Sequence, residues 1–237
     1  MKKAAIALVV SLLALHLLTV VGCGNGTWTN TGGSVSSYEI QSLAYDSGHK
    51  LLYAGTNNKG VWRYEGTTWT DTGGSLSSQT VGSLAYDSTH NLLYAGAVSQ
   101  GVLKYDGASW TNTGGGVSSY TVWSLAYDTT SNLLYSGTAK NGVWKYDGTT
   151  WTDTGGGVSS YGILSLAYNS AHNVLYAGCV SSTAKGKGVW KYDGTTWTNT
   201  GGSLSTHEIM SLAYDSANNL VYAGTSDHGV WKYSSSR

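Results

Sequence analysis

The chain has 237 residues, with 13 basic and 13 acidic side chains and a formal net charge of zero. Sparse, balanced charge without a basic stripe argues against nucleic-acid binding, and the length is sufficient to bury a core. The composition of 33 Gly, 18 Tyr and 10 Trp, with no Pro and no Phe, indicates short strands joined by tight turns.

The first 22 residues predict a secretory signal, because two lysines precede an apolar run over residues 4–21. The run ends in Val20-Val21-Gly22-Cys23, which resembles the lipobox of bacterial lipoproteins. That resemblance implies that Cys23 is lipidated and becomes the mature N-terminus, with residues 23–26 as a tether. Gly24 follows where Asp would retain the protein in the inner membrane, so the resemblance implies the outer membrane, facing the periplasm or the cell surface. An uncleaved anchor helix is the alternative.

Cys179 is the other cysteine of the chain. With Cys23 lipidated, no intrachain disulfide can form. We interpret Cys179 as a small apolar core residue, since no histidine lies near it in sequence to activate a thiol.

One unit occurs five times along the chain. The segment "SLAYD", or "SLAYN" in the fourth unit, begins at Ser42, Ser83, Ser124, Ser165 and Ser211, so the spacings are 41, 41, 41 and 46. The extra residues lie in "VSSTAKGK", from Val180 to Lys187. Internal repeats of this length are typical of solenoids and propellers.

Each unit contains four short runs rich in Tyr, Trp, Val and Leu. In the first unit they cover residues 40–46, 51–55, 60–64 and 67–72. The second run is apolar with almost no alternation, so both of its faces should be buried. A sheet packed between two neighbouring sheets meets that requirement, and four strands in about 41 residues indicate a β-propeller blade.

The two ends of the repeat region complement each other. Residues 27–31 match a lone fourth strand, and the last unit stops after its third strand at residues 229–233. An open stack of sheets would need atypical capping repeats, which neither end provides. We therefore predict an all-β, five-bladed propeller of four-stranded antiparallel blades over residues 27–234. Its ring would be closed when the N-terminal strand joins the last blade, which removes free edges and gives a monomer; residues 235–237 form a tail.

The junction between the third and fourth runs resembles a known motif. Tyr105-Asp106-Gly107-Ala108-Ser109-Trp110 is similar to the bacterial-neuraminidase (Asp-box) repeat and to the propeller repeats of two-component sensor ectodomains, although it is one residue shorter and lacks the leading Ser. The resemblance implies that Asp106, Asp147 and Asp193 are turn residues far from any active site. Asp-Gly between two strands is also a hairpin signal in its own right.

Catalytic and metal chemistry find little support. A sialidase clamps its substrate carboxylate with three arginines, but the chain has only Arg63 and Arg237. A glycosidase needs two facing carboxylates, and Glu39 and Glu208, at one place in the first and fifth units, form the candidate pair of a hydrolase alternative.

Histidines recur at one turn of the repeat, at His49, His90 and His172. They would fall on different blades, too far apart for one ion. We expect no metal site, no cofactor and no enzymatic activity.

Comparison of the five copies shows where the sequence varies. Variation collects in the segment that enters the first strand and in the loop between the second and third strands. Antiparallel strands bring both to one face, which we call the variable face; the other two turns form the uniform face. The candidate ligand-binding residues are Tyr38, Glu39, Gln41, Tyr120, Trp123, Tyr161, His207 and Glu208. Drift of unconstrained loop tips is the alternative explanation.

Aromatic rings beside hydrogen-bonding groups suit a carbohydrate or peptide surface. Because Cys23 would enter at the uniform face, the variable face would point away from the membrane. The sequence therefore predicts a lipid-anchored extracytoplasmic recognition module for a glycan or an envelope or extracellular protein. A structural or assembly protein of the cell envelope is the alternative.

Overall fold

The computed structural model describes residues 27–181 and 188–234. The expected signal, the lipidated Cys23 with its tether, most of the insertion and the tail lie outside these residues. The chain divides into Met1–Thr31 and Gly32–Arg237, and the second unit contains every sheet. In the described ranges, no helix is both long and apolar enough to cross a membrane.

The second unit contains five antiparallel sheets. The first has β1 (Ile40–Asp46), β2 (Leu51–Thr56), β3 (Val61–Tyr64) and β4 (Trp69–Asp71). The second has β5 (Val81–Asp87), β6 (Leu92–Ala97), β7 (Gly101–Tyr105) and β8 (Trp110–Asn112). The third has β9 (Val122–Asp128), β10 (Leu133–Thr138), β11 (Val143–Tyr146) and β12 (Trp151–Asp153). The fourth has β13 (Gly162–Asn169), β14 (Val174–Val180), β15 (Val189–Tyr192) and β16 (Trp197–Asn199), and the fifth has β17 (Ile209–Asp215), β18 (Leu220–Thr225) and β19 (Val230–Ser234).

A short 3-10 turn precedes each sheet. These are η1 (Ser34–Ser37), η2 (Gly74–Leu76), η3 (Gly115–Val117), η4 (Gly156–Val158) and η5 (Gly202–Thr206). Leu76, Val117 and Val158 are fully buried. The turns η2, η3 and η4 thus each place one apolar side chain in the core. Gly60 and Gly101 have positive φ and approach the carbonyls of Leu76 and Val117 so closely that a Cβ would collide with them.

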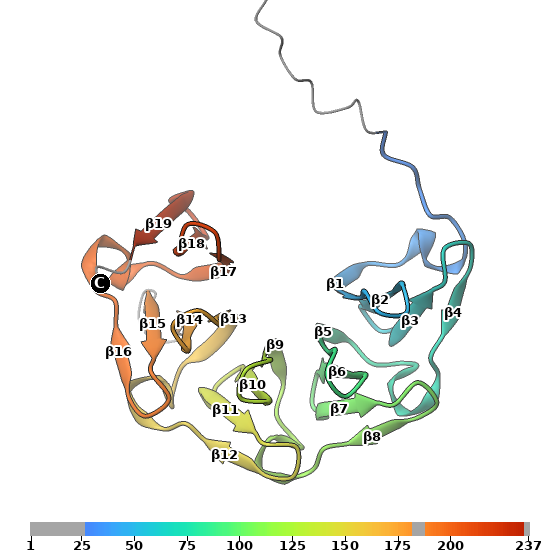
Figure 1. Cartoon of the computed structure of the whole chain (residues 1–237), viewed down its shortest axis with the longest axis horizontal. Helices are drawn as coiled ribbons and strands as arrows, with labels where there is room; N and C mark the ends of the chain where they lie inside the picture. Colours follow the sequence, from blue (N-terminus) through green and yellow to red (C-terminus); the bar gives the residue numbers. More distant parts are fainter. Residues whose placement is uncertain (1–26, 182–187, 235–237) are drawn as a thin grey trace, which may run out of the picture. The chain divides into compact units, whose positions relative to one another are not determined.

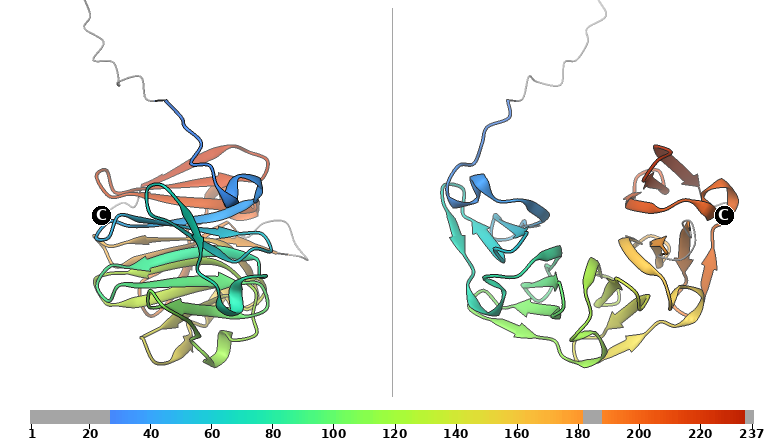
Figure 2. Two further views of the ribbon diagram at one scale, coloured as in Figure 1. Left: turned by 90° about the vertical axis from the view of Figure 1, so that its right-hand side faces the viewer. Right: turned by 180° about the vertical axis from the view of Figure 1, so that it is seen from behind.

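Within the Gly32–Arg237 unit the sheets follow one another along an arc, with their first strands on its inner side (Figure 1; Figure 2 shows the same sheets from the side and from behind). Each first strand packs against the next, from β1 through β5, β9 and β13 to β17. The prediction of an all-β fold of five blade-like sheets is therefore confirmed.

The core lies between neighbouring sheets. Tyr53 and Val61 of the first sheet share one cluster with Val81 and Leu93 of the second, and this arrangement recurs along the arc. The inner second strands are buried on both faces, as β6 illustrates with a run of buried residues. The near absence of alternation in these strands is thus explained by sheets on both sides.

The two end sheets leave uncovered the positions that the inner sheets bury. Val230 of β19 is 76% exposed, whereas its equivalent Val102 is 0% exposed. Leu43 of β1 is 59% exposed, whereas its equivalent Leu84 is 8% exposed. The fifth sheet has three strands, and residues 27–31 contain no strand, with Trp28 fully exposed. Ring closure and the shared last blade therefore stay predictions.

Candidate functional site

Hydrogen bonds confirm that the two variable segments meet on one face. The Gly60 N–H donates to the Gln79 carbonyl at 3.0 Å, and the Gly101 N–H donates to the Tyr120 carbonyl at 3.0 Å. Each of these bonds joins the loop after a second strand to the segment that enters the next sheet. The variable face is therefore continuous from sheet to sheet.

Every first strand contains a β-bulge at the variable face. In β1 the pairing with β2 skips from Ile40 to Ser42, and the same irregularity recurs in the other four sheets. The skipped residues are Gln41, Gly82, Trp123, Leu164 and Met210. A bulged residue has no partner in the ladder, and bulges commonly re-aim side chains at binding sites. A position that holds a different residue in every copy is thus one that the ladder leaves unpaired.

The tyrosines of the variable face are half-buried against tryptophans of the third strands. The ring centroids of Tyr38 and Trp62 are 5.4 Å apart, and those of Tyr120 and Trp144 are 5.9 Å apart. Trp62 Nε1 also donates to the Lys59 carbonyl at 2.9 Å, which holds the variable loop in place. Comparison of the copies missed these tryptophans because they hardly vary.

Trp123 and Glu39 take different positions on this face. Trp123 is 37% exposed and lies across Gly82, where a Cβ would be 3.1 Å from its ring. Glu39 is exposed, and its carboxylate accepts hydrogen bonds from Gln41 Nε2 at 2.8 Å and Asn57 Nδ2 at 2.9 Å.

A pocket of about 320 Å³ opens on the variable face over the fourth sheet, between residues of the third and fifth sheets. Its lining residues are Ala139, Lys140, Ser160, Gly162, Leu164, Val180, Ser181, Glu208 and Met210. Leu164 and Met210 are bulge residues, and Gly162 and Glu208 occupy the place of Glu39 in their units. The pocket thus combines the variable positions of three consecutive sheets, with a cation from the third and an anion from the fifth beside apolar surface.

The predicted site residues are only partly brought together. Glu208 lines this pocket and Glu39 does not, so Glu39 and Glu208 as a catalytic pair stay a hypothesis. Leu164, Met210 and Lys140 were outside the predicted set. These three residues could be identified only from the bulge positions together with the order of neighbouring sheets, and the sequence shows neither.

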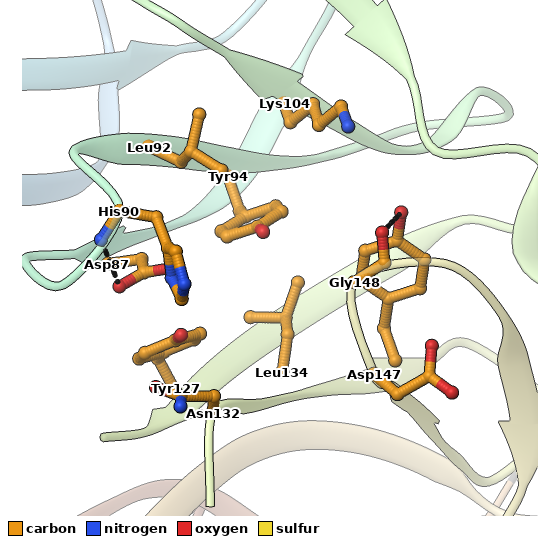
Figure 3. A pocket seen from close by; sticks show the side chains of 11 residues that line it. Asp87, His90, Leu92, Tyr94, Lys104, Tyr127, Asn132, Leu134, Asp147 and Gly148 are labelled. Atoms are coloured by element: carbon orange, nitrogen blue, oxygen red, sulfur yellow. Dashed lines mark hydrogen bonds and ion pairs between the residues drawn. The ribbon is translucent and has the colours of Figure 1, made fainter.

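Two further pockets lie on the uniform face and are copies of each other. The first, of about 280 Å³, is shown in Figure 3 and is lined by Asp87, His90, Leu92, Tyr94, Lys104, Tyr127, Asn132, Leu134, Tyr146, Asp147 and Gly148. The second, of about 270 Å³, is lined by the residues 41 positions earlier, from Asp46 to Gly107. Both lie where a turn between the first and second strands meets the turn before a fourth strand of the next sheet.

The aspartates of these pockets join neighbouring sheets. Asp46 is buried and accepts hydrogen bonds from the Gly48 and His49 N–H groups and, at 2.7 Å, from the Tyr86 hydroxyl of the next sheet. Burial would raise the pKa of Asp46, but the hydrogen bonds from Tyr86 and His49 outweigh it and lower the pKa. These aspartates therefore hold the turn that follows the first strand and also link neighbouring sheets.

Two polar side chains of the Figure 3 pocket come from the second and third strands of the second sheet. Tyr94 and Lys104 extend into it from β6 and β7 (Figure 3), and burial raises the pKa of Tyr94 to about 12. Both groups can donate hydrogen bonds to a small polar ligand. The carboxylate of Asp87 is already engaged by His90 and the N–H of Thr89, so we interpret this pocket as scaffold.

The turn interpretation of the Asp-Gly motif is also confirmed. Asp106 Oδ1 accepts hydrogen bonds from the N–H groups of Ala108 at 2.9 Å and Ser109 at 2.8 Å. These bonds lower the pKa of Asp106. Cys179 is buried in the core of the fourth sheet, where burial raises the pKa of its thiol to about 12. It is therefore an apolar core residue as expected.

Comparison with known proteins gives a fold and no family. No family model matches the chain, and no curated protein matches it. Two solved structures of the extracellular domain of BT4673 from B. thetaiotaomicron are similar, one described as a one-component system and the other as a hybrid two-component system. The first has a TM-score of 0.63 and 21% identity over 82% of this chain and 27% of that one. The second has a TM-score of 0.66 and 20% identity, over 84% and 28%.

The chain thus spans about a quarter of the length of these extracellular domains. At this identity the similarity shows the fold alone, which is that of propeller-type repeats. It agrees with the expected resemblance to sensor ectodomains. The lipobox and Asp-box resemblances stay predictions.

Proposed function

We propose that the chain is an extracytoplasmic recognition domain that binds a glycan or protein ligand on its variable face, and that it is anchored to the outer membrane through Cys23. The β-bulge at the variable position of every sheet is the observation that carries this proposal. The bulge releases one residue per sheet from the ladder, at the same height on one face. Side chains so placed can change without cost to the fold, which suits a surface selected for its ligand.

The pocket over the fourth sheet, with lining from the third to the fifth sheets, is the concave part of this surface on which the proposal is built. Lys140 and Glu208 offer a donor and an acceptor, while Leu164 and Met210 offer apolar contact. Such a mixture fits a ligand with hydroxyl or amide groups on an apolar framework, as glycans and peptides have. The other bulge positions carry Gln41, Gly82 and Trp123, so the sheets would bind related groups unequally and gain affinity through avidity.

The test is a binding screen of the full-length protein in detergent against arrayed glycans and isolated envelope proteins. The double variant Glu208→Gln, Met210→Ala removes the acid and the long side chain from the pocket, and Trp123→Ala removes the exposed ring. We expect both variants to weaken the detected interaction. The matched control is His90→Ala on the uniform face, which should leave binding unchanged.

Two results would overturn the proposal. If the variable-face variants keep every interaction while the His90 variant loses one, the protein uses its uniform face, as an assembly protein of the envelope would. If a bound glycan is cleaved, and cleavage disappears on Glu39→Gln or Glu208→Gln, the protein is a hydrolase.

A further inference from the structure

Three metal-ligating side chains meet on the fifth sheet. His207 lies just before β17, and Asp227 and His228 lie in the loop between β18 and β19. Their ligand atoms are all within 4.8 Å of one another. His228 Nδ1 is 2.6 Å from Asp227 Oδ1, and His207 Nδ1 is 3.7 Å from the same oxygen. The two imidazole rings are in contact, with centroids 4.0 Å apart.

The fifth unit alone has this combination. The place of His207 holds Tyr38, Gln79, Tyr120 and Tyr161 in the other units. The places of Asp227 and His228 hold Asn58 and Lys59 in the first unit, Ser99 and Gln100 in the second, and Lys140 and Asn141 in the third. Asn58 and Ser99 have positive φ, whereas Asp227 does not. The repeat scaffold therefore does not require these three side chains, and the cluster needs another explanation.

The backbone around the cluster is held by hydrogen bonds. The His228 N–H donates to Thr225 Oγ1 at 2.9 Å, and Trp231 Nε1 donates to the His228 carbonyl at 3.1 Å. The His207 N–H donates to the Leu204 carbonyl at 3.0 Å, and the His207 ring lies over Trp231. Fixed backbone on both sides lowers the cost of bringing the ligands together.

We propose that His207, Asp227 and His228 bind a divalent transition-metal ion of the Zn²⁺ class. Around a tetrahedral Zn²⁺ with bonds of 2.0–2.2 Å, neighbouring ligand atoms lie about 3.3–3.6 Å apart. The His207 Nδ1–Asp227 Oδ1 separation of 3.7 Å is close to this range. The His228 Nδ1–Asp227 Oδ1 hydrogen bond of 2.6 Å would lengthen when the metal replaces the His228 proton. Imidazole nitrogen selects Zn²⁺, Cu²⁺ or Ni²⁺ over Ca²⁺ and Mg²⁺, which prefer oxygen. Three protein ligands leave one position open, and because the cluster lies on the variable face, a bound ligand could complete the coordination.

The test uses untagged full-length protein in detergent, treated with chelator and titrated with ZnCl₂ by calorimetry. We expect one ion per chain, and a loss of affinity of at least about tenfold for each of His207→Ala and His228→Ala. His49→Ala and His90→Ala are matched controls, because each of these exposed histidines pairs with a single aspartate. They should keep the affinity of the unchanged protein.

CoCl₂ gives a second readout, since a tetrahedral site with imidazole ligands gives visible absorption that should vanish in the His207 and His228 variants. Circular dichroism of each variant separates lost binding from lost folding. Absence of Zn²⁺ binding by the folded protein would overturn the proposal. Equal losses in the control variants would overturn it as well, because binding would then be scattered over surface histidines.

Discussion

Gly101 and Gly229 occupy the same place in the second and fifth units, and they have nearly the same backbone conformation, with φ of 68° and 70°. An alanine at either position pays for a left-handed conformation, about 1 kcal/mol or somewhat more. The two sites differ in their surroundings. A Cβ at Gly101 would meet the Val117 carbonyl carbon at 2.8 Å and its oxygen more closely still, whereas nothing lies within 4 Å of a Cβ at Gly229.

The clash at Gly101 is with backbone, which cannot swing away as a side chain could. Relief requires the second and third sheets to separate locally, at a cost of about 1–3 kcal/mol beyond the conformational penalty. We therefore expect Gly101→Ala to lower the free energy of unfolding by about 2–5 kcal/mol, and Gly229→Ala to lower it by about 1 kcal/mol.

Urea unfolding followed by tryptophan fluorescence measures the free energy of unfolding of both variants. The midpoints report stability provided that the m-value stays constant. Equal, small losses of stability would show that the second and third sheets do not approach each other closely at Gly101. Equal, large losses would show that the backbone around Gly229 is also covered. In that case the fifth sheet packs against the first, and the ring closes as the sequence predicts.

Three other predictions follow from single interactions. Tyr86→Phe leaves the buried Asp46 carboxylate without one donor, so unfolding should become easier by about 1–3 kcal/mol, whereas Tyr45→Phe at an exposed hydroxyl should change little in the same urea titration. The lowered pKa values of Asp46 and Asp87 stabilise the folded state above the unfolded value of 3.8, so stability should fall as pH drops below about 4; a pH titration of thermal unfolding without such a fall would contradict the assignment. Cys179, with its pKa raised to about 12 by burial, should react with a thiol reagent at pH 8 only after urea unfolds the chain; rapid reaction of folded protein would place it outside the core.

The sheets could be predicted because the same pattern of strand and turn residues occurs five times in the sequence. The expected first strand over residues 40–46 matches β1, and the apolar second strand is buried on both faces as predicted. The bulge at Gln41 could not be predicted, since an unpaired residue is recognised only when the partner strand is known. The same limit applies to the pocket beside Glu208, which is lined by residues of three consecutive sheets.

The place of His228 in a cluster could not be predicted from the sequence for a different reason. Its position depends on a loop held by Thr225 and Trp231, and sequence separation alone does not place it beside His207. The recurrent histidines of the sequence, His49, His90 and His172, all belong to the turns of the uniform face. A cluster formed once in the chain gives no such periodic signal.

The uncovered end sheets have a consequence for chains that meet each other. Leu43 lies on the face of the first sheet that, in every inner sheet, packs against the preceding sheet. Val230 lies on the face of the fifth sheet that, in every inner sheet, packs against the following sheet. The two ends of one molecule are therefore complementary to each other and, equally, to the opposite ends of every other copy. Such a head-to-tail interface is heterologous: it terminates when it closes on itself and otherwise propagates. Closure within one chain uses up both ends, whereas pairing between chains leaves two ends free and leads to a filament, so dilution would favour the monomer and high protein concentration the polymer.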